Sequence, residues 1–303
     1  MIKAHAHACL AKQLRGLMAH AAVRVALGLL IGGACGIGCA RVSSGPIAEA
    51  PRAAAGKSAR SDEQLLSVDF DEDPLGAYTP AQLAADWGTV EGWSNGLSNG
   101  RASIVVTDHQ QSLRILYPSG AVGPTDGGAQ FLVKLARAYD DLYCSYRVRF
   151  GPGFNFVRGG KLPGLVGGSR PTGGKPRNDG FSARLMWRAG GAAVQYVYYP
   201  NQTSTYGVDL QYLRRFQPGV WHRVEHRVVM NTPGQADGVL QAWFDGQLVL
   251  DLHDRVWRLD TSVHVDALYF STFFGGNDAS FAPTRDESID FDDFVVSTQP
   301  IGD

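Results

Sequence analysis

Short runs in which apolar and polar residues alternate recur from about residue 65 to the end of the chain, between clusters of Gly, Pro, Asn and Asp. Alternation with a period of two is typical of strands that bury one face, because successive side chains of a strand point to opposite sides. Many such runs separated by turn residues predict an all-β sandwich or jelly roll in a single domain. No internal repeat indicates a propeller or a solenoid.

Residues 142–150 show this alternation most clearly. One face carries Leu142, Cys144, Tyr146, Val148 and Phe150, while Ser145, Arg147 and Arg149 share the other. Cys144 falls on the apolar face. It is the one cysteine beyond residue 39, so it has no internal disulfide partner, and we expect a small buried side chain rather than a catalytic thiol.

Three further segments have distinct patterns. Asp245-Gly246 stands between two apolar stretches and predicts a two-residue hairpin turn. Residues 267–274 are apolar on both faces, which predicts a central strand covered on both sides. Only residues 79–87 look helical, with Thr79 as the N-cap and a proline at the first helical position.

The N-terminal residues differ from the rest of the chain. Residues 25–38 form an apolar run with basic residues upstream, which is too short to span a bilayer and is typical of a signal-peptide core. We therefore expect an exported protein, secreted, periplasmic or anchored to the outer membrane. Residues 1–39 are then the signal, 40–63 a flexible linker rich in small residues, and 64–303 the folded domain.

Cys39 follows Gly38 and precedes a small polar stretch, which resembles a bacterial lipoprotein processing site. This pattern predicts a membrane tether through a lipidated Cys39, with Cys35 as a second candidate. The alternative is ordinary cleavage nearby and a soluble secreted protein that lacks both cysteines. Met18 is an alternative start that keeps the same apolar run.

The charges nearly cancel, with 28 Lys and Arg against 29 Asp and Glu. No overall positive field would attract nucleic acid, so any site for a polyanion has to be a local patch. The sequence therefore predicts no nucleic-acid partner. We expect a monomer.

The most unusual segment is the glycine-rich stretch 158–180, which carries five basic residues. It predicts a long loop that places cationic side chains and backbone amides around an anion. The plain alternative is a solvated surface loop. The segment lacks the ending of a nucleotide phosphate loop.

Two amphipathic runs follow this stretch. In residues 181–188, Ser182, Arg184 and Arg188 share one face, and a glycine turn separates this run from Tyr196 and Tyr198, which also share a face. If the two runs pair as a hairpin, Arg184 and both tyrosines lie on one surface. The alternative is that the tyrosines only pack on the sheet.

These residues are similar to those of the family 14 polysaccharide lyases, a concanavalin-like jelly-roll family that acts on alginate and related polyuronates. The resemblance spans most of residues 65–298. It rests on seven segments, at residues 161–168 (KLPGLVGG), 181–187 (FSARLMW), 195–198 (QYVY), 219–223 (GVWHR), 237–246 (DGVLQAWFDG), 269–276 (YFSTFFGG) and 289–294 (IDFDDF). The first three with their spacing are specific, whereas WFDG hairpins occur in many sandwiches.

The resemblance implies that Lys161, Ser182, Arg184, Tyr196 and Tyr198 line the catalytic cleft. Removing the C5 proton of a uronate builds charge on a group that already carries a carboxylate, so a guanidinium such as that of Arg184 suits the site. We expect Lys161 and Tyr198 to exchange the protons, either one as the base. Ser182 and Tyr196 would orient the sugar, and Tyr196 completes the catalytic set.

Arg147, Arg149 and Arg188 are further candidates for substrate binding, because guanidinium groups pair with carboxylates. The implied activity is a carbon–oxygen lyase that cleaves an acidic, uronate-containing glycan by β-elimination and requires no cofactor. A glycan-binding sandwich without catalysis is the main alternative, since the same fold and groove would serve adhesion.

Hydrolysis is disfavoured because it needs two carboxylates in one cleft, and Glu287 falls on the opposite face from Asp290 and Asp292. Those aspartates cap the last strand or bind a structural calcium. His222 and His226 share a strand face but are too far apart for easy shared ligation, so we expect no zinc site. His226 remains a weak candidate for the cleft.

Overall fold

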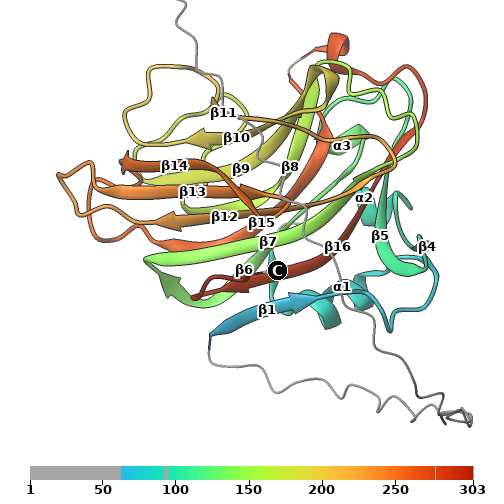
Figure 1. Ribbon diagram of the computed structural model, residues 1–303, viewed down its shortest axis with the longest axis horizontal. Coiled ribbons are helices and arrows are strands. Elements are labelled where there is room, and N and C mark those ends of the chain that lie inside the picture. Colours follow the sequence, from blue (N-terminus) through green and yellow to red (C-terminus); the bar gives the residue numbers. More distant parts are fainter. Residues whose placement is uncertain (1–62, 92–94, 277, 303) are drawn as a thin grey trace, which may run out of the picture. The chain divides into compact units, whose positions relative to one another are not determined.

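The computed structural model of the protein describes residues 63–91, 95–276 and 278–302, all within one compact unit, Lys57–Asp303. The predicted signal peptide, Cys39 and nearly all of the predicted linker lie outside these residues. Two antiparallel sheets form a sandwich (Figure 1), which confirms the predicted all-β jelly-roll class. None of the helices in the described ranges is long and apolar enough to cross a membrane.

Within the described residues the larger sheet contains nine strands. Their order is β14 (Gln247–Arg255), β13 (Gly238–Phe244), β12 (Trp221–Val229), β7 (Asp141–Phe150), β16 (Glu287–Ser297), β5 (Gln110–Tyr117), β4 (Ala102–Thr107) and β2 (Gly76–Ala77), with β1 (Gln64–Val68) paired to β16. Many neighbours in this sheet are far apart in the sequence, as in a jelly roll.

The smaller sheet contains seven strands in the same described ranges. Their order is β11 (Val208–Arg215), β10 (Ala192–Tyr198), β9 (Gly180–Arg188), β8 (Gly159–Gly168), β15 (Val265–Phe274), β6 (Ala129–Tyr139) and β3 (Val90–Glu91). The helical elements are short, and they are α1 (Pro80–Trp87), α2 (Asn95–Ser98), α3 (Gly123–Asp126) and the 3₁₀ turns Ala189–Gly191 and Ala279–Phe281.

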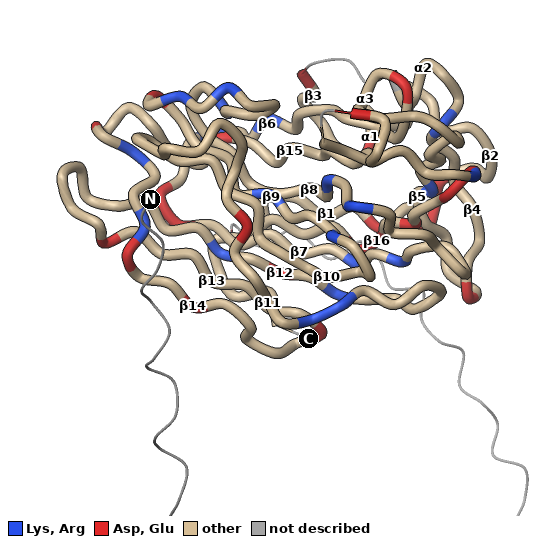
Figure 2. The backbone as a smooth tube through the Cα atoms, turned by 90° about the horizontal axis from the view of Figure 1, so that it is seen from above, with Lys and Arg blue, Asp and Glu red and all other residues tan. Residues whose placement is uncertain are grey.

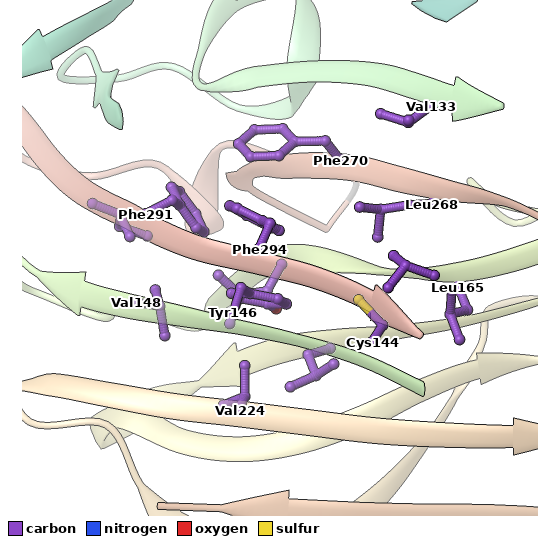
Figure 3. Packing of buried hydrophobic residues seen from close by; sticks show 14 of the residues in the cluster. Val133, Cys144, Tyr146, Val148, Leu165, Val224, Leu268, Phe270, Phe291 and Phe294 are labelled. Atoms are coloured by element: carbon purple, nitrogen blue, oxygen red, sulfur yellow. The ribbon is translucent and has the colours of Figure 1, made fainter. Parts of the chain in front are cut away.

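Apolar side chains from both sheets fill the space between them. Figure 3 shows Val133, Leu165, Leu268 and Phe270 of the smaller sheet near Cys144, Tyr146, Val148, Val224, Phe291 and Phe294 of the larger one. Trp87 of α1 packs edge to face with Phe294, with the ring centres 4.9 Å apart. Helix α1 therefore covers part of this core, where a capping box at Thr79 starts it as predicted.

Several predicted strands and turns are confirmed. In β7 the apolar face is buried and includes Cys144, whose thiol pKa burial raises. Asp245 and Gly246 connect β13 to β14, both with positive φ (48° and 73°), as a two-residue hairpin turn requires. Strand β15 lies between β6 and β8, near the middle of its sheet.

The prediction of one long loop over residues 158–180 was wrong for its first half. Residues Gly159–Gly168 form β8, and the loop is confined to residues 169–179. The glycines of β8 permit close packing: a Cβ at Gly160 would lie 2.0 Å from the ring of Trp187, and one at Gly167 would lie 1.8 Å from the carbonyl oxygen of His264. Glycine is needed at these positions because neighbouring atoms leave no room for a side chain, and not because the backbone has to be flexible.

Candidate active site

Strands β8, β9, β10 and β15 present a group of functional side chains on the outer face of the smaller sheet. Arg184 on β9 lies directly opposite Tyr196 on β10, and Lys161 on β8 lies opposite Met186 on β9. Residues directly opposite in an antiparallel pair project from the same face. Lys161, Arg184, Tyr196 and Tyr198 therefore line one cleft, with a volume of about 490 Å³. The sheet pairing thus brings together the four residues predicted to be catalytic.

Arg184 lies at the floor of this cleft, with 2% of its surface exposed. Its Nη1 donates to Ser271 Oγ at 3.2 Å, whereas Nε and Nη2 are buried and have no hydrogen-bond partner among the described residues. Burial lowers the pKa of Arg184, yet a guanidinium stays protonated at working pH. Nε and Nη2 form one edge of the guanidinium. This edge has the geometry to hold both oxygens of a carboxylate.

Lys161 lies beside an aromatic ring and a thioether. Its Nζ is 3.5 Å from the centre of the Tyr196 ring and 2.7 Å from Met186 Sδ. Burial, followed by the charges of Arg184 and Arg188, holds the pKa of Lys161 well below its usual range. An amine with such a pKa can be neutral at working pH and accept a proton.

Two loops hold the hydroxyl groups of the cleft tyrosines. The amide of Gly174 donates to Tyr198 Oη, and the amide of Gly207 donates to Tyr196 Oη, each at 3.0 Å. The two hydroxyl oxygens lie 3.4 Å apart. Burial, together with the neighbouring Tyr198, raises the pKa of Tyr196 above its usual value. Since one hydroxyl can donate to the other, at least one phenolic proton is free for a ligand.

Ser182 supports the cleft from beneath a loop. It lies opposite Tyr198, but it is fully buried, and its hydroxyl donates to the carbonyl oxygen of Pro171 at 2.9 Å. This bond anchors the loop of residues 169–179, whose Gly174 reaches Tyr198. The structure therefore places Ser182 as an anchor of the loop and not on the surface of the cleft.

The three other arginines predicted to bind substrate are paired with carboxylates. Arg188 lines the cleft and donates through Nε and Nη2 to Asp209, at 2.8 and 2.6 Å. Arg147 and Arg149 lie on β7 of the larger sheet and do not line the cleft, and Arg149 pairs with Asp290. The alternation in the sequence correctly predicts that both arginines point away from the core. It does not predict which of the two sheets their outer face belongs to.

The sequence reasoning missed the contribution of β15. Tyr269 and Ser271 line the cleft, and Tyr269 Oη donates to Gln130 Oε1 at 3.1 Å. Arg184 Cζ lies 5.4 Å from the centre of the Tyr269 ring. The strand is central as predicted, but its second face borders the cleft and is not covered. The sequence did contain a signal for this face, because Tyr269 and Ser271 both carry hydroxyl groups and are two residues apart on a strand.

Several other candidates have structural partners. His222 Nδ1 lies 2.8 Å from the Asp245 carboxylate, and His226 points into the core rather than into the cleft. Asp290, a predicted cap or calcium ligand, accepts from Arg114 Nε at 2.7 Å. In the described ranges no group of three His, Cys, Asp or Glu side chains is placed to hold a metal ion.

Acidic and basic positions are scattered over the backbone (Figure 2), so the positive charge of the cleft is local. The fold and the cleft place the chain in the class of antiparallel β-sandwich proteins that carry a basic, tyrosine-lined cleft on the outer face of one sheet. Residues 106–294 match the family model described as Polysaccharide lyase 14. The chain therefore belongs to polysaccharide lyase family 14 and is an enzyme of that family, as the sequence resemblance implied.

Solved structures of alginate lyases are similar to this chain. The marine family 14 alginate lyase from Aplysia kurodai is 27% identical, with a TM-score of 0.68 over 78% of this chain and 99% of that one. Alginate lyase Aly36B is 26% identical, with a TM-score of 0.68 over 78% and 97%. A double variant of Aly36B, seen in complex with an alginate trisaccharide, is 25% identical with a TM-score of 0.69 over 78% and 99%. A search of curated protein sequences gives no significant match.

Proposed function

We propose that the protein cleaves an acidic, uronate-containing polysaccharide, such as alginate or a glucuronan, by β-elimination. The observation that carries this proposal is the buried guanidinium of Arg184, whose Nε and Nη2 have no partner within the described part of the chain. A buried charge without a counter-ion is unfavourable unless a ligand supplies one. The carboxylate of a uronate at the cleavage site supplies it. The similar lyases that act on alginate support the same substrate class.

The reaction needs this cation because of where charge develops. When C5 loses its proton, negative charge spreads onto the neighbouring carboxylate and gives an enolate-like intermediate. Arg184 faces that carboxylate in a site that excludes most water, where electrostatic stabilisation is strongest. Ser271, which accepts from Nη1, holds the plane of the guanidinium.

Lys161 and Tyr198 are the proton-transfer pair in this proposal. One takes the proton from C5 while the C4–O4 bond breaks, C4 and C5 become doubly bonded, and the other gives a proton to the departing O4. The lowered pKa of Lys161 suits the base, and the Tyr198 hydroxyl, held by the Gly174 amide, suits the acid. Tyr196 supports Lys161 with its ring and Tyr198 with its hydroxyl.

The reaction class is tested by the products. Incubation with alginate, glucuronan and other polyuronates should raise the ultraviolet absorbance of a new double bond, and products should carry a 4,5-unsaturated uronate at the non-reducing end. Mass spectrometry that finds one water added at every cleaved bond would instead establish hydrolysis. Tight binding without any unsaturated product from any polymer would establish a binding module.

The role of Lys161 is tested by substitution. Lys161→Ala should lower kcat by roughly 100-fold or more and change KM little, because it removes a proton-transfer group and leaves Arg184 in place. Lys134→Ala is the matched control, since Lys134 lies on β6 of the same sheet and pairs with Glu91 outside the cleft. Near-full turnover of Lys161→Ala with an unchanged Tm would show that the proposed mechanism is wrong.

Export belongs to the same proposal, because a polymeric substrate lies outside the cell. The apolar run 25–38 and Cys39 support it. The mature protein should lack roughly the first 30 to 40 residues, as expected for a cleaved signal peptide, and intact mass measurement on protein from its native host checks this. Recovery of the Met1-initiated or Met18-initiated chain from the cytosol would contradict it.

A further inference from the structure

The strand that carries Lys161 has a bulge two residues further on. Between Leu162 and Gly164, β8 advances two residues while its partner β9 advances only one, from Leu185 to Arg184. Pro163 is the extra residue, and proline has no N–H to offer a neighbouring strand. Bulges of this kind re-aim side chains and are common next to active sites.

The bulge decides which side chains of β8 face the cleft. Leu162 and Leu165 are three residues apart, yet both are fully buried in the core. Strict alternation would send them to opposite faces, so the extra residue is what lets Lys161 point outward while both leucines point inward. A strand without this bulge would lose either the core contact of Leu165 or the position of Lys161.

Two side chains from the opposite sheet hold the bulge through its backbone. The amide of Leu165 donates to His226 Nε2 at 3.2 Å, and the carbonyl oxygen of Pro163 accepts from Tyr146 Oη at 3.1 Å. His226 lies on β12 and Tyr146 on β7, and both are fully buried. A buried backbone group turned out of its ladder needs such a partner.

We infer that His226 and Tyr146 are positioning residues that hold the β8 bulge and thereby set the position of Lys161 in the cleft. The inference rests on the proposed function of Lys161. The imidazole accepts at Nε2, so its proton is on Nδ1, which has no partner among the described residues. An apolar side chain at this position would not bury an unpaired N–H. The presence of a histidine here therefore indicates that its role is to accept the hydrogen bond from the Leu165 amide.

The chain contains a matched control on the same strand. His222 also points inward from β12, is buried, and accepts a backbone amide at Nε2, that of Gln217 at 3.0 Å. Its amide belongs to a loop before β12 and not to the strand of Lys161. His222→Leu and His226→Leu therefore both remove a bond to a backbone amide, and only the second removes it from β8. His222→Leu also removes the contact with Asp245, so it is the harsher change for stability.

We expect His226→Leu to lower kcat by roughly 10- to 100-fold, the scale of a small displacement of a catalytic group, with KM within about two-fold. His222→Leu should lower Tm without changing kcat of the folded enzyme. His226→Gln should restore most of the turnover, because its amide oxygen can accept from Leu165. Tyr146→Phe should lower kcat by a few-fold, since it removes the second anchor.

The pH–rate profile gives a readout that lost stability alone would not move. A displaced Lys161 regains solvent, so the limb set by its ionisation moves to higher pH in His226→Leu and stays in place in His222→Leu. The charged and titratable groups around this amine are Arg184, Arg188, Asp209 and Tyr196.

Hydrogen exchange tests the bulge independently of activity. The amide of Leu165 should exchange faster in His226→Leu by roughly 10-fold or more, and at the wild-type rate in His222→Leu. If His226→Leu does not fold, Tyr146→Phe takes its place, and fast exchange at Leu165 in this variant with wild-type kcat and pH profile overturns the inference.

The two proposals fail in different ways. If Lys161→Ala keeps its turnover, the proposed function is wrong, whatever His226 does. If Lys161→Ala is inactive while His226→Leu shows fast exchange at Leu165 together with unchanged kcat and pH profile, the function stands and the positioning role is overturned.

Discussion

Lys161 Nζ lies 3.5 Å from the centre of the Tyr196 ring. The ring face attracts the amine only when it is protonated. Burial and the charge of Arg184 oppose protonation and lower its pKa. The cleft therefore holds Lys161 beside a ring that favours its protonated form, while burial and Arg184 favour loss of its proton, and this balance has measurable consequences.

The first consequence is a pH-dependent stability contributed by Lys161. Its pKa is lower in the folded than in the unfolded chain, so the unfolded chain binds more protons between these two values and stability rises with pH across that interval. Lys161→Met should raise Tm most below the lowered pKa and lose this advantage as pH approaches roughly 10. Thermal melts from pH 5 to 10 check this, and parallel curves for the two proteins would contradict it. Lys134→Met is the control.

Arg184 should trade stability for activity. Arg184→Ala should lower kcat/KM by an amount that corresponds to about 2 to 5 kcal/mol of lost transition-state stabilisation. The reason is that the guanidinium faces a carboxylate that is present in both the ground state and the transition state. Folding should be unimpaired or improved by Arg184→Met, since this change removes a buried charge without a counter-ion among the described residues. Kinetics and thermal melts of both variants test this. Arg147→Ala, on the other sheet, should keep full turnover, and a large Tm loss in Arg184→Met would contradict the assignment.

Asp292 on β16 should destabilise the protein at alkaline pH. Burial, followed by the charge of Asp293, raises the pKa of Asp292 to about 8. The folded chain therefore binds more protons than the unfolded chain between roughly pH 4 and 8, and stability falls as pH rises through that window. Asp292→Asn should have little effect at pH 4 and stabilise by roughly 1 to 3 kcal/mol at pH 9. The free energy of unfolding of both proteins, measured by urea denaturation at pH 4 and pH 9, tests this prediction. An equal effect of the substitution at both pH values would refute it.

Ser182 should hold the loop of residues 169–179 closed. Ser182→Ala removes its bond to Pro171, worth about 1 kcal/mol, and should speed tryptic cleavage of the loop roughly five-fold. Cleavage is expected after Arg177, the basic residue of this loop that no proline follows. Ser112→Ala is the control, because Ser112 is equally buried on β5. Unchanged loop cleavage with reduced sugar binding would favour direct contact with the substrate.

Local interactions explain what the sequence by itself determined. Alternation in β7, the Asp245-Gly246 turn and the Thr79 cap depend on residues that are close in the chain, so their patterns were legible. The hairpin that joins Arg184 to Tyr196 is also local, which is why these residues could be placed on one surface. Their catalytic role came from the family resemblance.

Only the tertiary structure decided to which sheet each outward-facing side chain belongs and which residues pack against the other face of each strand. Alternation has a period of two in both sheets, so it does not separate Arg149 on β7 from Arg184 on β9. The glycines of β8 read as a loop because the crowding that requires them comes from Trp187 and His264. The bulge partners of β8 are 17 and 61 residues away along the chain, and packing of the two sheets brings them together.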